Sequence, residues 1–494
     1  MREGSFLSSF LLLPSSLSPN LSFFLSLKKF LMLLSPNSIK KFPGKPIKRQ
    51  RMGGPGCYRM SATLGIRRED KNRWEQRVPL TPQHVLELKK KYGVETFIQP
   101  SNIRVFSEEE YRKVGAHVQD SLTPSSVVFA VKEIPVDFFE RGKTYIFFSH
   151  TIKGQRHNMP MLKKMMEMGC TLIDYERIVD NNGRRLVFFG RFAGLAGMVD
   201  ALWTFGQRLA WEQIDSPFNE IKQTIHYKDL EDIKKHFTAI GKVIKTNGLP
   251  QGLTPLIIGF TGYGNVSIGA QEILDILPIK EIKPEEIESI FKNPSNKVIY
   301  KVVFKEEHMV ETASLDKKFD LQDYYSHPDG YRPAFERYIP SLSILMNCIF
   351  WSAQYPRLLT KKYLKKSFQK GEKLRLKVIG DISADVNGAI ECTEKTTSPD
   401  NPVFIYNPNT DTIKDGYEGD GVVVMAVDNL PCELPRESSQ SFSETLLRFV
   451  PDVMKADFTV ADFNTVALPF EIKNAVILYQ GKLTPAYQYI NKYL

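Results

Sequence analysis

Short apolar runs alternate along this chain with stretches in which apolar residues recur every three or four positions. The runs inside 126–135 and 144–155 predict buried β-strands, whereas PLTPQHVLELKKKYG, residues 79–93, predicts a helix that ends at Gly93. Strand and helix patterns alternate in this way through most of the chain. This alternation predicts an α/β fold with mostly parallel sheets.

A longer helix is predicted over 192–211, and its apolar residues cover more than one face. Gly190, Gly194 and Gly197 recur along one side, which favours close packing against a neighbouring backbone. Asp200 and Arg208 argue against a membrane span. We therefore expect a buried helix that joins two domains.

The basic residues are concentrated at the beginning of the chain. The formal charge is +10, but residues 1–60 contain ten Lys or Arg and one acid, so the rest is nearly neutral. The sequence therefore predicts no nucleic-acid partner. Proline and lysine interrupt the apolar runs before residue 30, so no membrane anchor is expected either.

The leader, residues 1–60, is rich in Ser, Leu and Phe and poor in acids, a composition typical of organellar transit peptides. We expect a mitochondrial matrix protein. A secretory signal in FLSSFLLL is an alternative. Another alternative is that translation starts at Met52 or Met60, which would leave a cytoplasmic protein.

The cysteines show no paired spacing and no CxxC motif. They are expected to be reduced thiols, with neither a disulfide framework nor a metal site. The positions are Cys57, Cys170, Cys348, Cys392 and Cys432.

Two candidate catalytic residues, Lys132 and His150, each follow an apolar run directly. In an open α/β sheet the carboxyl ends of the strands line the ligand site. An amine with a lowered pKa and an imidazole form an acid/base pair suited to a carbonyl or an imine. The alternative is that Lys132 forms a surface ion pair with Glu133 and that His150 is a structural histidine at a strand end, with its hydrogen bonds satisfied within the protein.

A second candidate site lies in residues 252–277, which read as strand, glycine-rich turn and helix. Gly259, Gly262 and Gly264 would allow the backbone to approach a pyrophosphate at the start of the helix. The spacing is GxxGxG rather than GxGxxG, so the assignment depends on the strand and helix that flank it. A purely structural turn is the alternative.

Several long segments, taken in order, resemble the alanine dehydrogenase and saccharopine dehydrogenase superfamily. The resemblance is strongest to the lysine:2-oxoglutarate reductase half of aminoadipic semialdehyde synthase and begins at about residue 62. It is carried by IRREDKNRWEQRVPLTP, IQPSN, FFSHTIKGQ, LIDYERIVD, FTGYGNVSIGAQ, PRLLT, DISADVNGAIE and DNLPCELPRE.

The resemblance implies two Rossmann-like domains with the active site in the cleft between them. The corresponding parts are a leader at 1–60, a catalytic domain at 61–190, and a dinucleotide-binding domain at 191–430. An inserted segment lies at about 284–340, and residues 431–494 are expected to return to the first domain.

The implied reaction condenses L-lysine with 2-oxoglutarate and reduces the imine with NADPH to saccharopine, the first step of lysine degradation. Lys132 and His150 match the family's acid/base residues, and Glu133 and Glu176 match carboxylates that tune their pKa. The matching substrate-binding residues are Arg77, Lys132, Gln155 and Phe189. The matching cofactor-binding residues are Arg184, Gly262, Tyr263, Gly264, Ile349 and Asp381.

Three points stay open at this level. NAD-preferring relatives end the second strand of the nucleotide domain with an acid, whereas the matching stretch here contains Lys280 and Lys283, either of which could favour a 2′-phosphate. Glu281 leaves this open, so the expectation of NADPH rests mainly on the resemblance, and NAD is not excluded. Asp381 could be only a strand-end cap. The oligomeric state is open, a homo-oligomer included.

The chain matches only one half of the bifunctional relatives, so a separate saccharopine dehydrogenase is expected downstream. An alternative within the enzyme class is an NAD-dependent, lysine-forming saccharopine dehydrogenase, with alanine dehydrogenase more distant. An alternative outside it is a regulator that binds dinucleotide but has lost catalysis.

Overall fold

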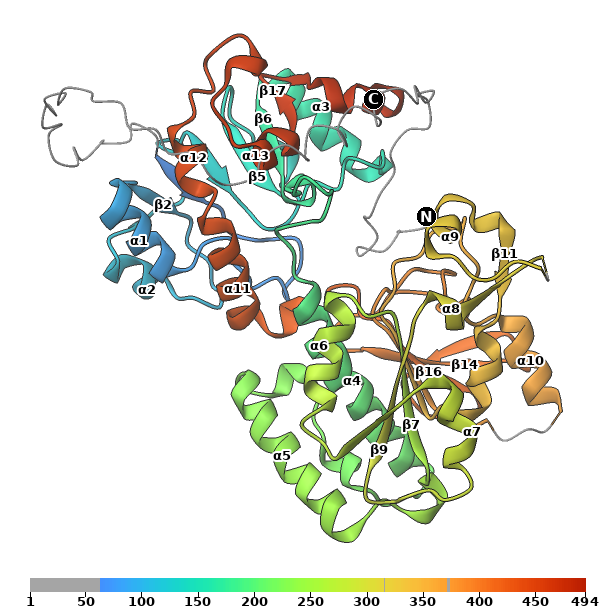
Figure 1. The fold of residues 1–494 in the computed structure, drawn as a ribbon. Helices are drawn as coiled ribbons and strands as arrows, with labels where there is room; N and C mark the ends of the chain where they lie inside the picture. Colours follow the sequence, from blue (N-terminus) through green and yellow to red (C-terminus); the bar gives the residue numbers. More distant parts are fainter. Residues whose placement is uncertain (1–62, 315, 371–373) are drawn as a thin grey trace, which may run out of the picture. The chain divides into compact units, whose positions relative to one another are not determined.

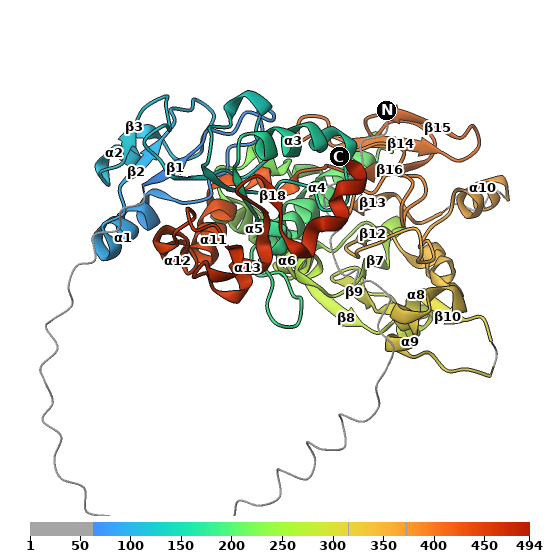
Figure 2. The same cartoon turned by 90° about the horizontal axis from the view of Figure 1, so that it is seen from above.

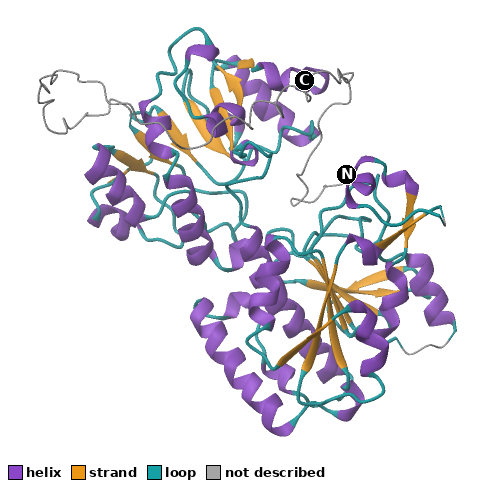
Figure 3. Ribbon diagram, in the orientation of Figure 1, coloured by secondary structure: helices purple, strands orange, loops and turns teal. Residues whose placement is uncertain are grey.

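The computed structural model describes residues 63–314, 316–370 and 374–494 of the 494-residue chain. The predicted leader and Cys57 lie outside these residues. The described part contains two eight-stranded sheets and a two-stranded hairpin. Helices cover the sheets, as Figure 1 and Figure 3 show. The predicted α/β class is confirmed.

The first sheet has the strand order β18-β17-β6-β5-β4-β1-β2-β3. Six strands are parallel, whereas β17 runs antiparallel to β6 and β18 antiparallel to β17. The strands are β1 (Leu64–Ile66), β2 (Thr96–Ile98), β3 (His117–Val118), β4 (Val127–Phe129), β5 (Thr144–Phe147), β6 (Thr171–Asp174), β17 (Val476–Tyr479) and β18 (Lys482–Leu483).

The helices around this sheet come from both ends of the described chain. They are α1 (Pro82–Tyr92), α2 (Glu108–Lys113), α3 (Met159–Glu167), α11 (Pro435–Leu447), α12 (Val450–Lys455) and α13 (Phe470–Ala475). Figure 2 shows α11, α12 and α13 as one neighbouring group in red. The predicted return of the C-terminal segment to the first domain is confirmed, because β17 extends this sheet.

The local sequence explains where these helices begin and end. Pro82 occupies the first turn of α1, and Gly93 ends that helix at φ 69° with its amide donating to the carbonyl of Lys89. A capping box starts α2, because Ser107 and Glu110 satisfy each other's backbone amides.

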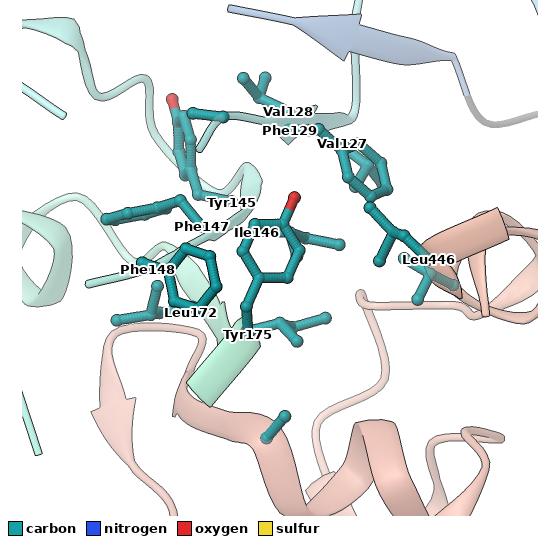
Figure 4. Packing of buried hydrophobic residues seen from close by; sticks show 14 of the residues in the cluster. Val127, Val128, Phe129, Tyr145, Ile146, Phe147, Phe148, Leu172, Tyr175 and Leu446 are labelled. Carbon is teal, nitrogen blue, oxygen red and sulfur yellow. The ribbon is translucent and has the colours of Figure 1, made fainter. Parts of the chain in front are cut away.

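The core of the first sheet is continuous with α11. Figure 4 shows the rings of Phe148 and Tyr175 beside strand residues such as Ile146, with Leu446 approaching from α11. Phe442, also on α11, meets the Tyr175 ring edge to face at 5.0 Å. Residues far apart in the sequence therefore share one core.

The second sheet has the order β15-β14-β16-β13-β12-β7-β9-β8. Six strands are parallel, and the β14–β15 hairpin adds two antiparallel strands at one edge. The strands are β7 (Leu256–Thr261), β8 (Ile279–Ile282), β9 (Ile299–Phe304), β12 (Ile344–Asn347), β13 (Val378–Asp381), β14 (Val403–Asn407), β15 (Thr412–Asp415) and β16 (Val422–Met425).

The remaining elements accompany this second sheet. The helices are α4 (Gly190–Trp211), α5 (Leu230–Asn247), α6 (Asn265–Leu274), α7 (Ile287–Ile290), α8 (Glu306–Met309), α9 (Leu321–Ser326) and α10 (Lys361–Gln369). The strands β10 (Val310–Thr312) and β11 (Tyr331–Pro333) form the separate hairpin. Part of the segment predicted as an insertion, 284–340, therefore supplies β9 to the sheet itself, and the exact domain boundaries stay a prediction.

The predicted close packing of the long helix is confirmed at α4 and α6. A methyl group at Gly194 would lie 1.9 Å from the carbonyl oxygen of Val266, and one at Gly269 would lie 2.0 Å from that of Arg191. The two backbones are in contact at reciprocal glycines. Among the described residues no helix is both long and apolar enough to cross a membrane.

Candidate active site

Lys132 and His150 occupy equivalent places after neighbouring parallel strands. Lys132 lies three residues beyond the end of β4, and His150 lies three residues beyond the end of β5. Both side chains are buried, so Lys132 does not lie at the surface as the alternative required. His150 adopts φ +48°, an uncommon backbone conformation for a residue with a side chain and one often found at functional sites.

Glu133 orients His150. One of its carboxylate oxygens lies 2.8 Å from His150 Nδ1, and the other accepts a hydrogen bond from Lys71 Nζ at 2.9 Å. Burial opposes the ionised form, but the histidine hydrogen bond and the charges of Lys71 and Lys132 keep the pKa of Glu133 well below its usual value. An ionised Glu133 selects the form of His150 in which Nδ1 carries a proton, which leaves Nε2 for proton transfer.

Burial, followed by the positive charge of Arg77, lowers the pKa of Lys132. The backbone at Lys132 is fixed by Glu69, whose two carboxylate oxygens accept hydrogen bonds from the amides of Val131 and Lys132 at 2.7 and 2.9 Å. Burial and the nearby carboxylate of Glu75 raise the pKa of Glu69 to about 7. Lys132 is thus held rigidly in surroundings that favour its neutral amine.

Arg77 is buried in a bidentate ion pair with Glu75. Its Nε and Nη2 donate to the two carboxylate oxygens at 2.7 and 2.6 Å, and Nη2 also donates to Asn429 Oδ1 at 3.0 Å. The guanidinium lies 4.1 Å from the centre of the Phe189 ring, which stacks on Phe442. The structure therefore brings Arg77 and Phe189 into contact, as their joint assignment to the substrate site requires.

Helix α11 fixes the backbone on the C-terminal side of Arg77. Ser439 Oγ accepts a hydrogen bond from the Val78 amide at 2.9 Å, and Ser443 Oγ accepts one from the Thr81 amide at 3.0 Å. Since α11 follows this loop by more than 350 residues, the C-terminal segment contributes directly to the geometry of the site.

Glu176 and Gln155 lie in the segments that follow β6 and β5. Glu176 is buried and lies 3.7 Å from Arg185 Nη1. Gln155 is half-buried, and its side-chain oxygen accepts a hydrogen bond from the Lys153 amide at 3.3 Å. Asn158 Nδ2 donates to the carbonyl of His150 and joins this segment to the histidine. A direct action of Glu176 on His150, and a contact of Gln155 with substrate, stay predictions.

The glycine turn has the predicted context of strand, turn and helix. Gly262 adopts φ +85°, and a methyl group there would lie 2.9 Å from Ile349 Cγ2. At Gly264 a methyl group would meet no atom within 4 Å, so the backbone is open to a ligand just before α6 begins at Asn265. Such a turn fits a pyrophosphate in contact with backbone amides. The structure places Ile349 against Gly262.

Asp381, at the end of β13, has hydrogen-bond partners within the protein at both carboxylate oxygens. It accepts hydrogen bonds from Asn347 Nδ2 at 2.8 Å and from Thr393 Oγ1 at 2.5 Å, and Ala384 contributes its amide. Burial, partly opposed by these hydrogen bonds, raises its pKa to about 6. These contacts support the strand-end cap, the alternative reading of Asp381. Its contact with dinucleotide stays a prediction.

Arg184 forms an ion pair with Asp180 inside a tight turn, with Nε 2.7 Å from the carboxylate, and its side chain is largely exposed. Both residues of this ion pair belong to the turn, so the contact is local. The assignment of Arg184 to the cofactor therefore stays a prediction.

Sequence reasoning missed Glu69, Glu75 and Asn429 as members of the site. A signal existed for Glu75, because residues two apart in an extended segment point to the same side, and Glu75 precedes Arg77 by two. No local pattern identifies Glu69 or Asn429, since their partners are 62 and 352 residues away. Within the described residues, no cluster of His, Cys, Asp and Glu is arranged to hold a metal ion.

The fold therefore consists of two mostly parallel α/β sheets, with a glycine turn on one and Lys132 and His150 after neighbouring strands of the other. The alanine dehydrogenase/PNT N-terminal domain matches residues 65–196, and the alanine dehydrogenase/PNT C-terminal domain matches residues 331–486. Together these matches cover more than half of the chain, and the chain belongs to the alanine dehydrogenase/PNT family.

Among curated proteins, the chain is 38% identical over 448 residues to alpha-aminoadipic semialdehyde synthase of Arabidopsis thaliana. It is 34% identical over 444 residues to the mitochondrial alpha-aminoadipic semialdehyde synthase of Bos taurus. Each match covers 87% of this chain but only 41% and 48% of those relatives, so the chain spans less than half of their length.

Two further proteins are similar over nearly their whole length. A lysine-forming, NAD(+) saccharopine dehydrogenase of Candida glabrata is 29% identical over 78% of this chain and 91% of its own. An L-alanine dehydrogenase structure aligns with a TM-score of 0.55 and 17% identity, covering 87% of this chain and 99% of its own. The structural likeness supports the fold alone.

Proposed function

We propose that the chain catalyses the NADPH-dependent reductive condensation of L-lysine with 2-oxoglutarate to saccharopine. The observation that carries this proposal is the buried pair of His150 and Glu133 beside Lys132, whose pKa is lowered. The similarity to aminoadipic semialdehyde synthases and to a saccharopine dehydrogenase supports the choice of substrates.

The pair fits the proton transfers that this reaction needs. When the ε-amine of lysine forms a bond with the keto carbon, neutral Lys132 accepts the proton that leaves nitrogen. Nε2 of His150 protonates the keto oxygen and, after it has regained a proton from solvent, protonates the resulting hydroxyl, which departs as water and leaves an imine protonated on nitrogen. Glu133 stabilises the positive charge on His150 before each transfer.

Arg77 would bind a carboxylate of the substrate. Its Nε and Nη2 are used by Glu75 and Asn429, so the remaining Nη1 would meet the substrate. Phe189 covers the guanidinium and restricts water around it. The buried pair with Glu75 therefore orients the arginine in advance, which favours binding.

Gly262 and Gly264 would hold the dinucleotide pyrophosphate at the start of α6, with Ile349 packed against the turn. When bound, NADPH supplies the hydride that reduces the imine. The conformation of Gly262 and the open backbone at Gly264 fit this role.

The decisive test is a steady-state assay of the full chain and of a version that starts at residue 61. NADPH oxidation is followed with lysine and 2-oxoglutarate together and with each omitted. We expect turnover only when both are present, and a higher kcat/KM with NADPH than with NADH. Oxidation with pyruvate and ammonia instead would contradict the proposal in favour of an alanine dehydrogenase.

The similarity to the Candida glabrata enzyme favours a second candidate, the NAD-dependent formation of lysine from saccharopine. Assays in both directions with both dinucleotides distinguish it, because this candidate requires saccharopine and NAD as the efficient pair. Dinucleotide binding without turnover on any substrate would instead indicate a regulator. If the main proposal holds, a separate saccharopine dehydrogenase would consume the product.

The leader suggests where this reaction takes place. Its excess of basic residues and the mitochondrial name of the Bos taurus relative support import into the mitochondrial matrix. Residues 1–60 fused to a fluorescent protein are expected to direct it to mitochondria. Cytosolic fluorescence from both this fusion and the full-length fusion would contradict import.

A further inference from the structure

The strand beside the glycine turn is β9. β7 pairs with β9 in parallel register from Leu256↔Ile299 to Thr261↔Phe304, whereas β8 pairs with β9 on its far side. Neighbouring strands lie about 4.8 Å apart, so β8 is separated from β7 by roughly twice that distance. The sequence analysis assigned a possible 2′-phosphate contact to Lys280 and Lys283, which lie on and just after β8. Because β9 and not β8 is the neighbour of β7, this assignment is wrong.

The end of β9 is level with the turn. The amide of Gly262 donates to the carbonyl oxygen of Phe304 at 3.0 Å, and Lys305 is the next residue, where the chain leaves the sheet. In dinucleotide-binding folds this point of the neighbouring strand meets the ribose of the adenosine half. An acid there binds the 2′-hydroxyl, whereas a cation accommodates a 2′-phosphate. In this chain the residue at that point is an exposed lysine.

Glu306 is the competing residue, because a carboxylate at this place would favour a free ribose hydroxyl. Its Oε1 accepts a hydrogen bond from the Tyr325 hydroxyl at 2.7 Å. Burial and the contact with Glu306 raise the pKa of Tyr263, the middle residue of the glycine turn. Glu306 is thus engaged by the Tyr325 hydroxyl, while the side chain of Lys305 is exposed.

The lysine within β9, Lys301, already has two acidic partners. Lys301 Nζ lies 2.8 Å from Asp275 and 3.0 Å from Glu281, so its charge is compensated by two carboxylates. Lys280 lies over the ring of Tyr300 at 5.9 Å, on the side of β9 away from β7. These contacts leave Lys305 as the lysine best placed to meet a 2′-phosphate.

We propose that Lys305 determines whether this chain prefers a dinucleotide with a 2′-phosphate or one with a free 2′-hydroxyl. The proposal rests on the proposed binding of dinucleotide at Gly262 and Gly264. It adds the residue that distinguishes a ribose 2′-phosphate from a 2′-hydroxyl.

Two adenosine fragments test this proposal without turnover. 2′,5′-ADP carries the 2′-phosphate and 5′-AMP lacks it, and their dissociation constants are measured by titration calorimetry on the full chain. Lys305→Ala and Lys305→Glu are compared with Lys280→Ala and Lys283→Ala, which remove equally exposed lysines one strand away. Thermal unfolding of each variant checks that the fold is retained.

Lys305→Ala is expected to weaken 2′,5′-ADP about tenfold, and Lys305→Glu to weaken it further, because a charge-assisted hydrogen bond is lost and then a repulsion is added. Binding of 5′-AMP to both variants is expected to stay within about twofold of wild type. Both control variants are expected to bind both fragments like wild type.

The possible failures have separate meanings. Wild-type protein that binds neither fragment contradicts the dinucleotide site itself and this proposal with it. Wild-type protein that binds 2′,5′-ADP more tightly than 5′-AMP, with unchanged binding by Lys305→Ala, overturns the role of Lys305 alone. A tighter wild-type affinity for 5′-AMP, or a loss that appears in Lys280→Ala or Lys283→Ala, overturns it as well.

Discussion

The candidate acid/base site and the glycine turn are built from different kinds of groups. The first gathers buried charges, with Glu69, Glu75, Arg77 and Lys132 held by one another and by backbone amides. The second is built almost entirely from backbone, and its defining residues have no side chain. A site made of charges is therefore sensitive to changes of charge, and a site made of backbone is sensitive to an added methyl group.

The largest expected effect is on the acid/base pair. Lys132→Met and His150→Gln should each lower kcat by about 10² to 10⁴, the usual contribution of a general acid or base. Dissociation constants for NADPH should change little, because neither side chain belongs to the glycine turn. Steady-state kinetics and dinucleotide titrations measure both quantities. Near wild-type kcat in both folded variants would remove these residues from the mechanism.

The next effect is on stability, at the buried pair of Arg77 and Glu75. Arg77→Ala should lower the free energy of unfolding by about 3 to 5 kcal/mol, because the Glu75 carboxylate stays buried without its cation. The exposed pair of Arg112 and Glu108 is the matched control, and Arg112→Ala should cost under about 1 kcal/mol. Denaturant unfolding measures both.

A double variant separates the pair from general packing. If the stranded carboxylate causes the loss, Arg77→Ala combined with Glu75→Gln should be more stable than Arg77→Ala alone. A double variant that loses the sum of the two single effects would show that the residues act independently. Charge pairing would then not explain the site.

A smaller effect concerns pH and Glu69. Its pKa rises from 4.5 to about 7 on folding, so between these values the folded state binds more protons than the unfolded state. Stability from this group is therefore greatest below pH 4.5 and falls as pH rises to 7. Relative to wild type, Glu69→Gln should gain roughly 1 to 3 kcal/mol over that interval. Unfolding curves at pH 4.5 and 7 test this, and a pH-independent difference would contradict it.

The smallest effects on stability distinguish two glycines of one turn. Gly262→Ala should cost about 1 to 2 kcal/mol, because it places a side chain at positive φ and against Ile349. Gly264→Ala should change stability by less than about 0.5 kcal/mol, because its methyl group meets open space. Dinucleotide affinity should nevertheless fall in Gly264→Ala. Unchanged affinity there would place the pyrophosphate elsewhere.

The sequence predicted much of the fold because the signals were local. The apolar runs before Lys132 and His150, the glycine that ends α1 and the small residues of α4 each act within a few residues or one helix face. The pairing of β9 with β7 could not be predicted in this way. β8 comes first in the sequence, and only packing decides that β9 lies between them.

The residues of the candidate site also fall into those that the local sequence identifies and those that only the tertiary fold identifies. Lys132, His150 and the glycines follow strands directly and could be identified from their own segments. Glu69 and Asn429 could not, because each acts through a partner that only the tertiary fold brings near. Asp381 looked like a ligand-binding residue in sequence, whereas its hydrogen bonds to Asn347 and Thr393 also explain its burial.

The pairing of β17 with β6 has a consequence for the order in which the protein is made. β6 leaves the ribosome about 300 residues before β17, so the first sheet remains incomplete while all of the second sheet is synthesised. The second sheet, continuous in sequence from β7 to β16, can fold in the meantime. The loop that carries Arg77 is anchored by Ser439 and Ser443, so it can reach its final geometry only after the residues of the second sheet have been synthesised.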